Sequence, residues 1–177
     1  MNQKRIVFYR LNRETFLLLK NELKDIQLNR IGDDALELRL DAVWDIQDES
    51  EAKGVNELFI LLDGFDEEAL RAFIAYYKKY PELENSILVV RTQINSTWVI
   101  RDLFREVSRE HYLMKKVMKL SKMLKKTNQM NMSAIGDKER KLILDGFMAL
   151  QREELVEDEI DKAIEGLVAM GIADGNS

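Results

Sequence analysis

Residues 58–70 read LFILLDGFDEEAL, and this stretch does most to decide the fold. Its first five residues are all apolar, which is typical of a strand that is buried on both faces of a sheet. Gly64 suits a tight turn, and Asp66 is an N-cap type residue followed by Glu67 and Glu68. Acidic side chains there match the unpaired amide groups and the positive end of a helix. The stretch therefore predicts a strand that turns directly into a helix.

Three further segments have the composition of strands. They are the apolar runs at 6–9 and 87–90 and a weaker candidate at 26–31. Asn12 offers an N-cap for a helix after the first run. Strands that alternate with helices over short connections are typical of parallel βαβ units. The sequence therefore predicts an α/β fold with a small parallel four-stranded sheet of flavodoxin-like type and helices on both faces.

Residues 35–46 (ALELRLDAVWDI) fit two patterns. Leu36, Leu38 and Leu40 alternate as in a strand, whereas Leu36, Leu40 and Val43 also share one face of a helix. The acidic, polar stretch that follows is typical of a loop. We favour the helix, and the strand stays open as the alternative.

The rest of the chain has a helical pattern. The predicted elements are a long helix from Asn95 to about Lys126, a polar linker at 127–136 and two helices at about 137–154 and 156–170. The apolar side chains that define the first of these last two helices are Leu142, Ile143, Phe147 and Leu150. We expect residues 1–113 to form the α/β domain. Residues 114–177 should form a helical extension, made of the continuing basic helix, the linker and an acidic helical hairpin.

Charge is distributed unevenly along the chain, whose net charge is −5. Residues 101–126 carry nine basic and three acidic side chains, whereas residues 137–177 carry five and eleven. Opposite charges of this size can neutralise each other within the chain or across a dimer.

The stretch MKKVMKLSKMLKK at 114–126 has six lysines and no acidic residue. A basic, Met-rich amphipathic helix can bind an acidic groove, a membrane surface or nucleic acid. The absence of arginine and aromatic residues from it argues against nucleic acid. We favour the other interpretation, in which its apolar side packs on the two C-terminal helices.

Several kinds of chemistry are excluded or unsupported. The chain has no cysteine, and it has no P-loop, dinucleotide-binding or nucleophile-elbow motif. His111 is its only histidine and follows Glu110 directly, so the two side chains point about 100° apart on a helix. No apolar run approaches the roughly 18 residues that span a bilayer. We therefore expect a cytoplasmic protein that is not an enzyme, with no cofactor and no metal site.

A ligand pocket is the alternative. Open parallel sheets bind ligands beyond the carboxyl ends of their strands. The candidate residues at those ends are Asn12, Asp63 and Phe65, together with Thr92, Asn95 and Trp98. If their side chains converge, the protein would hold a small ligand or an enzymatic pocket there.

One further pattern covers the segment 59–115. FILLDGFDEEAL is followed by T-x-x-N-x-x-W, a leucine five residues on, and E-x-x-x-E-H. The residues that carry this pattern are Thr92, Asn95, Trp98, Leu103, Glu106, Glu110 and His111. The segment resembles the bacterial family known as domain of unknown function 3783. The resemblance implies a bacterial protein but no activity, because that family has no established function.

The signature residues have plain physical interpretations. We expect Asn95 to cap the long helix and Trp98, in its first turn, to cover the corner between strand and helix. Glu106 and Glu110 share one helix face and could pair with arginines such as Arg10 or Arg91, or face a partner.

The function that the sequence favours is a non-catalytic binding or regulatory module that acts through protein–protein contacts. Self-association as a homodimer through the C-terminal helices fits the opposite charges of the last two segments.

Overall fold

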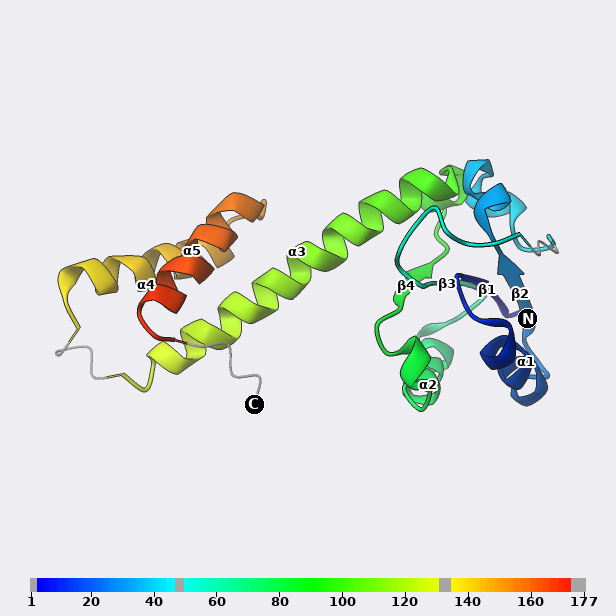
Figure 1. The fold of residues 1–177 in the computed structure, drawn as a ribbon, viewed down its shortest axis with the longest axis horizontal. Helices are drawn as coiled ribbons and strands as arrows, with labels where there is room; N and C mark the ends of the chain where they lie inside the picture. Colours follow the sequence, from blue (N-terminus) through cyan, green and yellow to red (C-terminus); the bar gives the residue numbers. More distant parts are fainter. Residues whose placement is uncertain (1–2, 47–49, 131–134, 173–177) are drawn as a thin grey trace. The chain divides into compact units, whose positions relative to one another are not determined.

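A computed structural model describes residues 3–46, 50–130 and 135–172 of the chain (Figure 1). The chain divides into two compact units, Met1–Ser108 and Arg109–Ser177. This division falls within α3, the long helix Ile100–Thr127, whereas we expected it after residue 113.

The first unit contains all four strands, at the places where the sequence predicted them. Its elements are β1 (Arg5–Tyr9), α1 (Arg13–Glu22), β2 (Gln27–Ile31), the 3₁₀ turns η1 (Asp33–Glu37) and η2 (Leu40–Ala42), β3 (Phe59–Asp63), α2 (Glu67–Tyr77), the 3₁₀ turn η3 (Pro81–Leu83), β4 (Ile87–Val90), the 3₁₀ turn η4 (Asn95–Thr97) and the start of α3.

The four-stranded sheet is mixed, so the prediction of a parallel, flavodoxin-like sheet is wrong. Its strand order is β2-β1-β3-β4, in which β1 pairs with β2 and β3 with β4 in parallel, while β1 and β3 are antiparallel. The register places Tyr9 beside both Ile31, where β2 ends, and Phe59, where β3 begins. The chain therefore leaves β2 and enters β3 at the same end of the sheet. A parallel arrangement would require it to return along the whole strand length.

The connection between β2 and β3 explains this difference. Within its described residues, the segment for which we favoured a helix forms the 3₁₀ turns η1 and η2. No α-helix carries the chain back along the sheet there. Leu36, Leu40 and Trp44 of the connection are buried against one sheet face instead.

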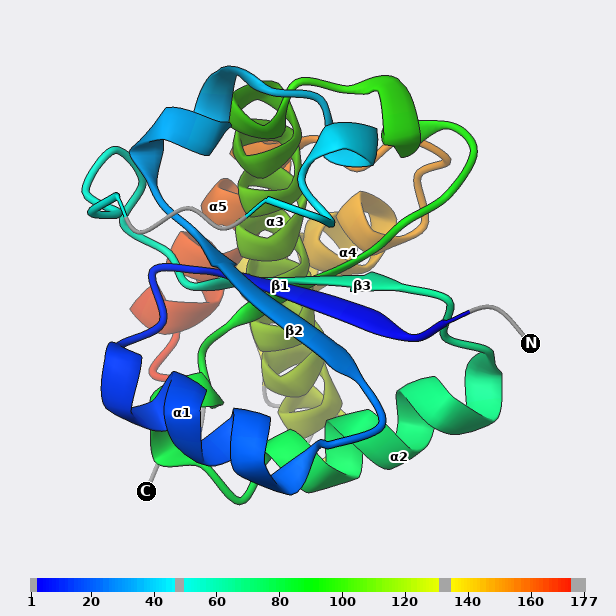
Figure 2. The same cartoon turned by 90° about the vertical axis from the view of Figure 1, so that its right-hand side faces the viewer.

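The opposite face is covered by α1 and α2, which lie on the same side of the sheet (Figure 2). Each helix begins in the same way. Arg10 and Gly64 come directly after β1 and β3 with φ angles of 67° and 75°, and an N-cap follows two residues later. Asn12 accepts a hydrogen bond from the Thr15 amide at 2.8 Å. Asp66 caps α2 similarly, so both predicted caps are confirmed.

The start of α3 packs on the face that carries the β2–β3 connection. Phe104 of α3 is fully buried, and its ring stacks on Phe59 with centroids 3.7 Å apart. Tyr9 contacts the Phe104 ring edge-on at 5.2 Å. Helices therefore lie on both faces of the sheet, as predicted.

The second unit contains the end of α3 together with α4 (Asp137–Leu150) and α5 (Glu157–Ala169). Residues 131–134 of the expected linker lie outside the described residues. Leu120, Met123 and Leu124 of α3 are buried against apolar residues of α4 and α5. These three residues of the basic helix are thus covered by the acidic helices, as in the interpretation that we favoured, whereas Met114 and Met118 remain exposed.

Charge complementarity accompanies this packing. The ammonium group of Lys116 on α3 lies 2.7 Å from carboxylate oxygens of both Glu157 and Asp161. The hydrogen bonds that Lys116 donates, first to Asp161 and then to Glu157, raise the pKa of Lys116. Among the described residues, no helix is long and apolar enough to cross a membrane.

Candidate functional site

A row of charged side chains crosses one end of the sheet. Asp63, at the end of β3, accepts hydrogen bonds from Arg5 on β1, whose Nε lies 3.0 Å away, and from Arg91 after β4 at 3.3 Å. The guanidinium of Arg5 also lies over the ring of Trp44, 5.2 Å from its centroid. The Asp63 side chain is only 15% exposed, and each of its two carboxylate oxygens is bound by one of these arginines. Asp63 of β3 therefore links β1 and the end of β4 through its two arginine partners.

The candidate strand-end residues do not all converge. Because β1 and β3 are antiparallel, Asn12 follows the end of β1 that lies beside the start of β3, away from Asp63. Phe65 packs on Phe73 of α2, with ring centroids 5.8 Å apart. It lines a shallow groove of about 250 Å³ whose other lining residues are Lys4, Leu23, Ile26, Ala69, Ala72, Phe73 and Tyr76. Asn12 and Asp63 therefore lie at opposite ends of the sheet, whereas the expected pocket assumed a parallel sheet.

Thr92 and Asn95 form a closed turn after β4. The Asn95 side-chain oxygen accepts from the Thr92 amide at 2.7 Å, and the Thr92 hydroxyl accepts from the Asn95 amide at 3.2 Å. The Asn95 side-chain NH₂ donates to the Val90 carbonyl at 3.0 Å. Asn95 thus stabilises the exit of β4. It does not cap α3, which begins only at Ile100.

Replacing Asn95 with alanine is expected to destabilise the protein by about 1–2 kcal/mol, because two backbone groups lose a hydrogen-bond partner. Chemical denaturation followed by tryptophan fluorescence measures the loss. Ser96→Ala is the matched control, since it removes one hydroxyl bond to the Gln93 carbonyl in the same turn. Equal, small effects of both substitutions would contradict this role of Asn95.

The remaining signature residues are distributed over both units. Trp98 has extended backbone angles after η4 and is 39% exposed, so it does not lie in the first turn of α3 as we expected. Glu106 belongs to the first unit, whereas Glu110 and His111 belong to the second. The ring of His111 packs edge-on against Tyr112 at 5.8 Å. Among the described residues, no group of three or more His, Asp or Glu side chains is placed to hold a metal ion.

Sequence reasoning missed a polar cluster around the buried Tyr9 at the other end of β1. The hydroxyl of Tyr9, a fully buried residue, donates to Asp33 at 2.7 Å and accepts from the Val55 amide at 3.0 Å. The Asp33 carboxylate also accepts from the backbone amides of Lys53 and Gly54 at about 3.0 Å. No spacing in the sequence indicates this cluster, because its members are far apart in the chain. It fixes the connection that precedes β3.

The cluster changes the acidity of its members. Burial, and next the hydrogen bond to Asp33, raise the pKa of Tyr9 from 10.0 to about 12. Hydrogen bonds from the Gly54 amide and from Tyr9 lower the pKa of Asp33. A raised tyrosine pKa stabilises the folded state fully below pH 10, and this contribution is lost as the pH rises from 10 through about 12.

Tyr9→Phe is expected to cost about 1–2 kcal/mol at neutral pH, because Val55 and Asp33 lose their hydroxyl partner. The difference in unfolding free energy between wild type and variant should shrink between pH 10 and 12, where only the wild type loses the Tyr9 contribution. Urea titrations at several pH values measure it. A difference that stays constant across this window would contradict the raised pKa.

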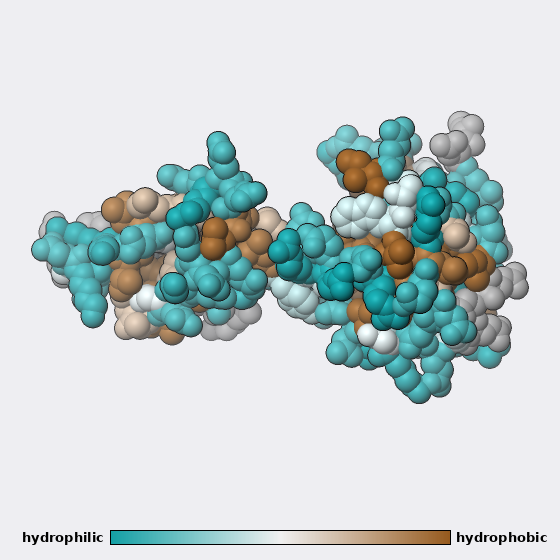
Figure 3. Space-filling view, turned by 90° about the horizontal axis from the view of Figure 1, so that it is seen from above, coloured by the Kyte–Doolittle hydropathy of each residue, from teal (hydrophilic) through white to brown (hydrophobic). Residues whose placement is uncertain are grey.

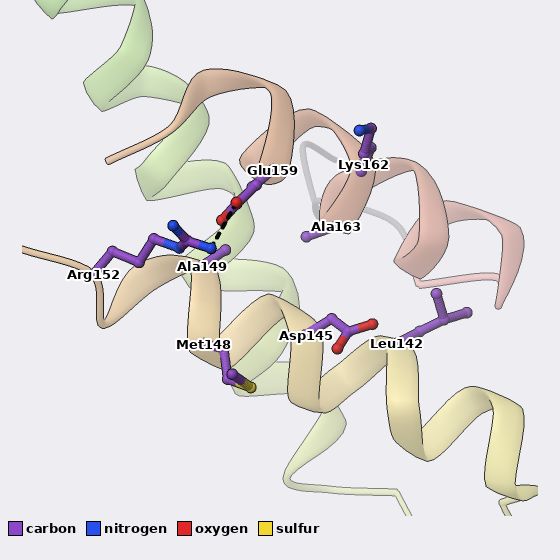
Figure 4. A pocket seen from close by; sticks show the side chains of 8 residues that line it. All are labelled: Leu142, Asp145, Met148, Ala149, Arg152, Glu159, Lys162 and Ala163. Carbon is purple, nitrogen blue, oxygen red and sulfur yellow. Dashed lines mark ion pairs between the residues drawn. The ribbon is translucent and has the colours of Figure 1, made fainter. Parts of the chain in front are cut away.

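A groove in the second unit lies between α4 and α5 (Figure 4). It has a volume of about 510 Å³ and is lined by Leu142, Asp145, Met148, Ala149, Arg152, Glu159, Lys162 and Ala163. Figure 4 shows Ala163 directed from α5 toward α4, and Arg152 paired with Glu159 at 2.7 Å across the end of the groove. Four lining residues are apolar, and the other four, Asp145, Arg152, Glu159 and Lys162, carry charges of both signs.

An apolar stripe on α4 borders this groove. Leu144, Phe147 and Met148 are 57%, 37% and 58% exposed and stand at positions i, i+3 and i+4, so they share one helix face. Phe147 and Ile143 are both among the apolar residues that predicted this helix, but Ile143 is buried whereas Phe147 is exposed. In Figure 3 apolar residues reach the surface of the protein between hydrophilic ones. We call Leu144, Phe147 and Met148 the α4 stripe.

Comparisons with known proteins bear on one segment. No curated protein and no solved structure matches the chain. Residues 58–114 match the model of the family described as "Domain of unknown function (DUF3783)". The match covers β3, α2, β4 and the beginning of α3. The resemblance inferred from the sequence is therefore confirmed for this segment, which is similar to the DUF3783 family.

Proposed function

We propose that the protein is a non-catalytic interaction module whose partner-binding surface is the α4 stripe and the adjoining α4–α5 groove. The observation that carries the proposal is the exposure of Leu144, Phe147 and Met148 on one helix face. Exposed apolar patches beside a groove are typical of protein–protein contact sites. Regulation through such contacts would require no catalytic residue in this chain.

The state of the polar candidates supports this choice. Asp63 is bonded to two arginines, and Asn95 is bonded to backbone groups of its own turn. A ligand at the strand ends would have to compete with these contacts. The setting that we propose is the bacterial cytoplasm, because the chain lacks cysteine and contains a segment of a family that we know from bacteria.

Site-specific photo-crosslinking tests the proposal. A photoreactive amino acid replaces Met148 in cells that make the protein at its natural level, and adducts are identified by mass spectrometry. We expect a discrete protein adduct that disappears when Phe147→Asp is added, because a buried carboxylate would disrupt an apolar contact. The matched control carries the photoreactive residue at Leu17, an apolar residue of α1 that is 49% exposed.

The crosslinking results distinguish a specific contact surface from a non-specific one. An adduct at position 148 that depends on Phe147 and is absent at position 17 supports the proposal. No adduct at position 148, or the same adducts at both positions, would show that this face is not a specific contact surface.

A further inference from the structure

The two ends of the α4 stripe carry opposite charges. Arg140 and Lys141 are exposed in the first half of α4. Glu153 and Glu154 are exposed in the turn that follows the helix. Arg140 lies 3.6 Å from Asp137, a fully exposed residue on the same helix, and such surface pairs contribute little energy. Counted with their neighbours, residues 137–141 carry three basic and two acidic side chains, a net charge of +1, and residues 152–154 carry one and two, a net charge of −1. The two ends of the stripe therefore have opposite net charges.

These charges are placed symmetrically about Phe147. Arg140 lies seven residues before it and Glu154 seven residues after it, while Lys141 and Glu153 lie six residues away on either side. Arg140 and Lys141 belong to α4, whereas Glu153 and Glu154 follow its last residue, Leu150. If two α4 helices cross antiparallel at Phe147, the basic end of each therefore faces the acidic end of the other.

We infer that the partner of the α4 stripe is a second copy of this chain, docked antiparallel through α4 about a two-fold axis near Phe147. A closed two-fold interface must be complementary to itself, and the opposite net charges at the two ends of the α4 stripe meet this requirement. Leu144 and Met148 of each copy then lie on either side of the axis and exclude water. The inference rests on the proposed function and names its partner.

Other occupants fit the charges less well. A uniformly acidic partner helix would meet Glu153 and Glu154 at one end, and a uniformly basic one would meet Arg140 and Lys141 at the other. Anionic lipid and nucleic acid are repelled by the same glutamates. Only a partner with both signs in reversed order matches both ends, and a second copy supplies it.

The test uses two full-length variants and their mixture. Arg140→Glu/Lys141→Glu makes both ends of the stripe acidic, and Glu153→Lys/Glu154→Lys makes both ends basic. Each variant alone should sediment as a monomer, because like charges face each other in its own dimer. An equimolar mixture should restore a dimer that contains one copy of each, because every basic end then meets an acidic end.

Controls guard against unfolding and against a general charge effect. The chain that combines all four substitutions reverses both ends and should dimerise by itself, which shows that the altered residues fold. Lys24→Glu/Lys78→Glu changes the net charge as much as the first variant but lies on the first unit, and it should remain dimeric. Circular dichroism should show the same helix content throughout.

Three results would overturn the inference: a monomeric wild type, variants that dimerise alone, or a mixture that stays monomeric. If the wild type is a monomer but residue 148 still crosslinks to a different protein, the proposed interaction surface stands. Only the inference that its partner is a second copy is then wrong. Crosslinks from residue 148 to the first unit of the same chain would contradict both proposals.

Discussion

Phe104→Ala is expected to destabilise the α/β unit by about 3–5 kcal/mol, a large share of the stability of a typical domain. Phe104 is fully buried, stacks on Phe59 at 3.7 Å and contacts Tyr9 edge-on. Its removal leaves a cavity where the start of α3 packs on the sheet. Both tryptophans of the chain lie in this unit, so urea titrations followed by their fluorescence report the loss directly.

The matched substitution is Phe104→Leu, which keeps most of the buried volume and should cost about 1.5 kcal/mol or less. If alanine and leucine had similar, small effects, the aromatic contact would not hold α3 on the sheet. That result would contradict the packing described here for this face.

The second large effect is expected from Leu124→Ala in the helical unit, at about 2–5 kcal/mol. Leu124 is 1% exposed, and α4 approaches it at Gly146, where an added Cβ would lie 3.2 Å from a Leu124 methyl group. The alanine variant therefore opens a cavity between α3 and α4. Since this unit contains no tryptophan, the loss should appear in circular dichroism, while the fluorescence transition remains unchanged.

Met118→Ala is the control on the same helix, because Met118 is 57% exposed and its truncation should change stability by less than about 0.5 kcal/mol. If Leu124→Ala shifted the fluorescence transition as strongly as the dichroism, the two units would unfold together. That result would contradict the expectation that the two compact units unfold independently.

Local features of the fold were predictable from the sequence because they depend on neighbouring residues. The apolar run at 58–62 marked β3, and Asn12 and Asp66 were recognised as helix caps by residue type and position. The direction of β3 was not predictable in this way. It depends on where the β2–β3 connection packs, which sequence periodicity does not encode.

Asn95 shows a similar limit within the candidate site. An asparagine side chain can cap a following helix or close a turn on the preceding backbone, and both use the same hydrogen-bonding groups. The sequence indicated the first use, whereas the structure has the second. Five residues separate Asn95 from Ile100, so the start of α3 was placed too early in the prediction.

The α4 stripe was visible in the sequence only as a surplus of apolar residues on one helix. Ile143 and Phe147 stand four residues apart and were both among the apolar residues that predicted the helix. The structure buries Ile143 and exposes Phe147, because α3 and α5 cover only one side of α4. Which side is covered follows from the packing of three helices, and a single helical pattern cannot supply it.

Sedimentation equilibrium of the full-length protein over a range of concentrations tests the central claim, self-association through α4, most directly. Wild type should approach twice its monomer mass of 20.7 kDa as concentration rises, whereas Leu144→Glu/Met148→Glu should remain at 20.7 kDa throughout. A wild type that sediments at 20.7 kDa at every concentration, or a double variant that dimerises as well as wild type, would contradict it.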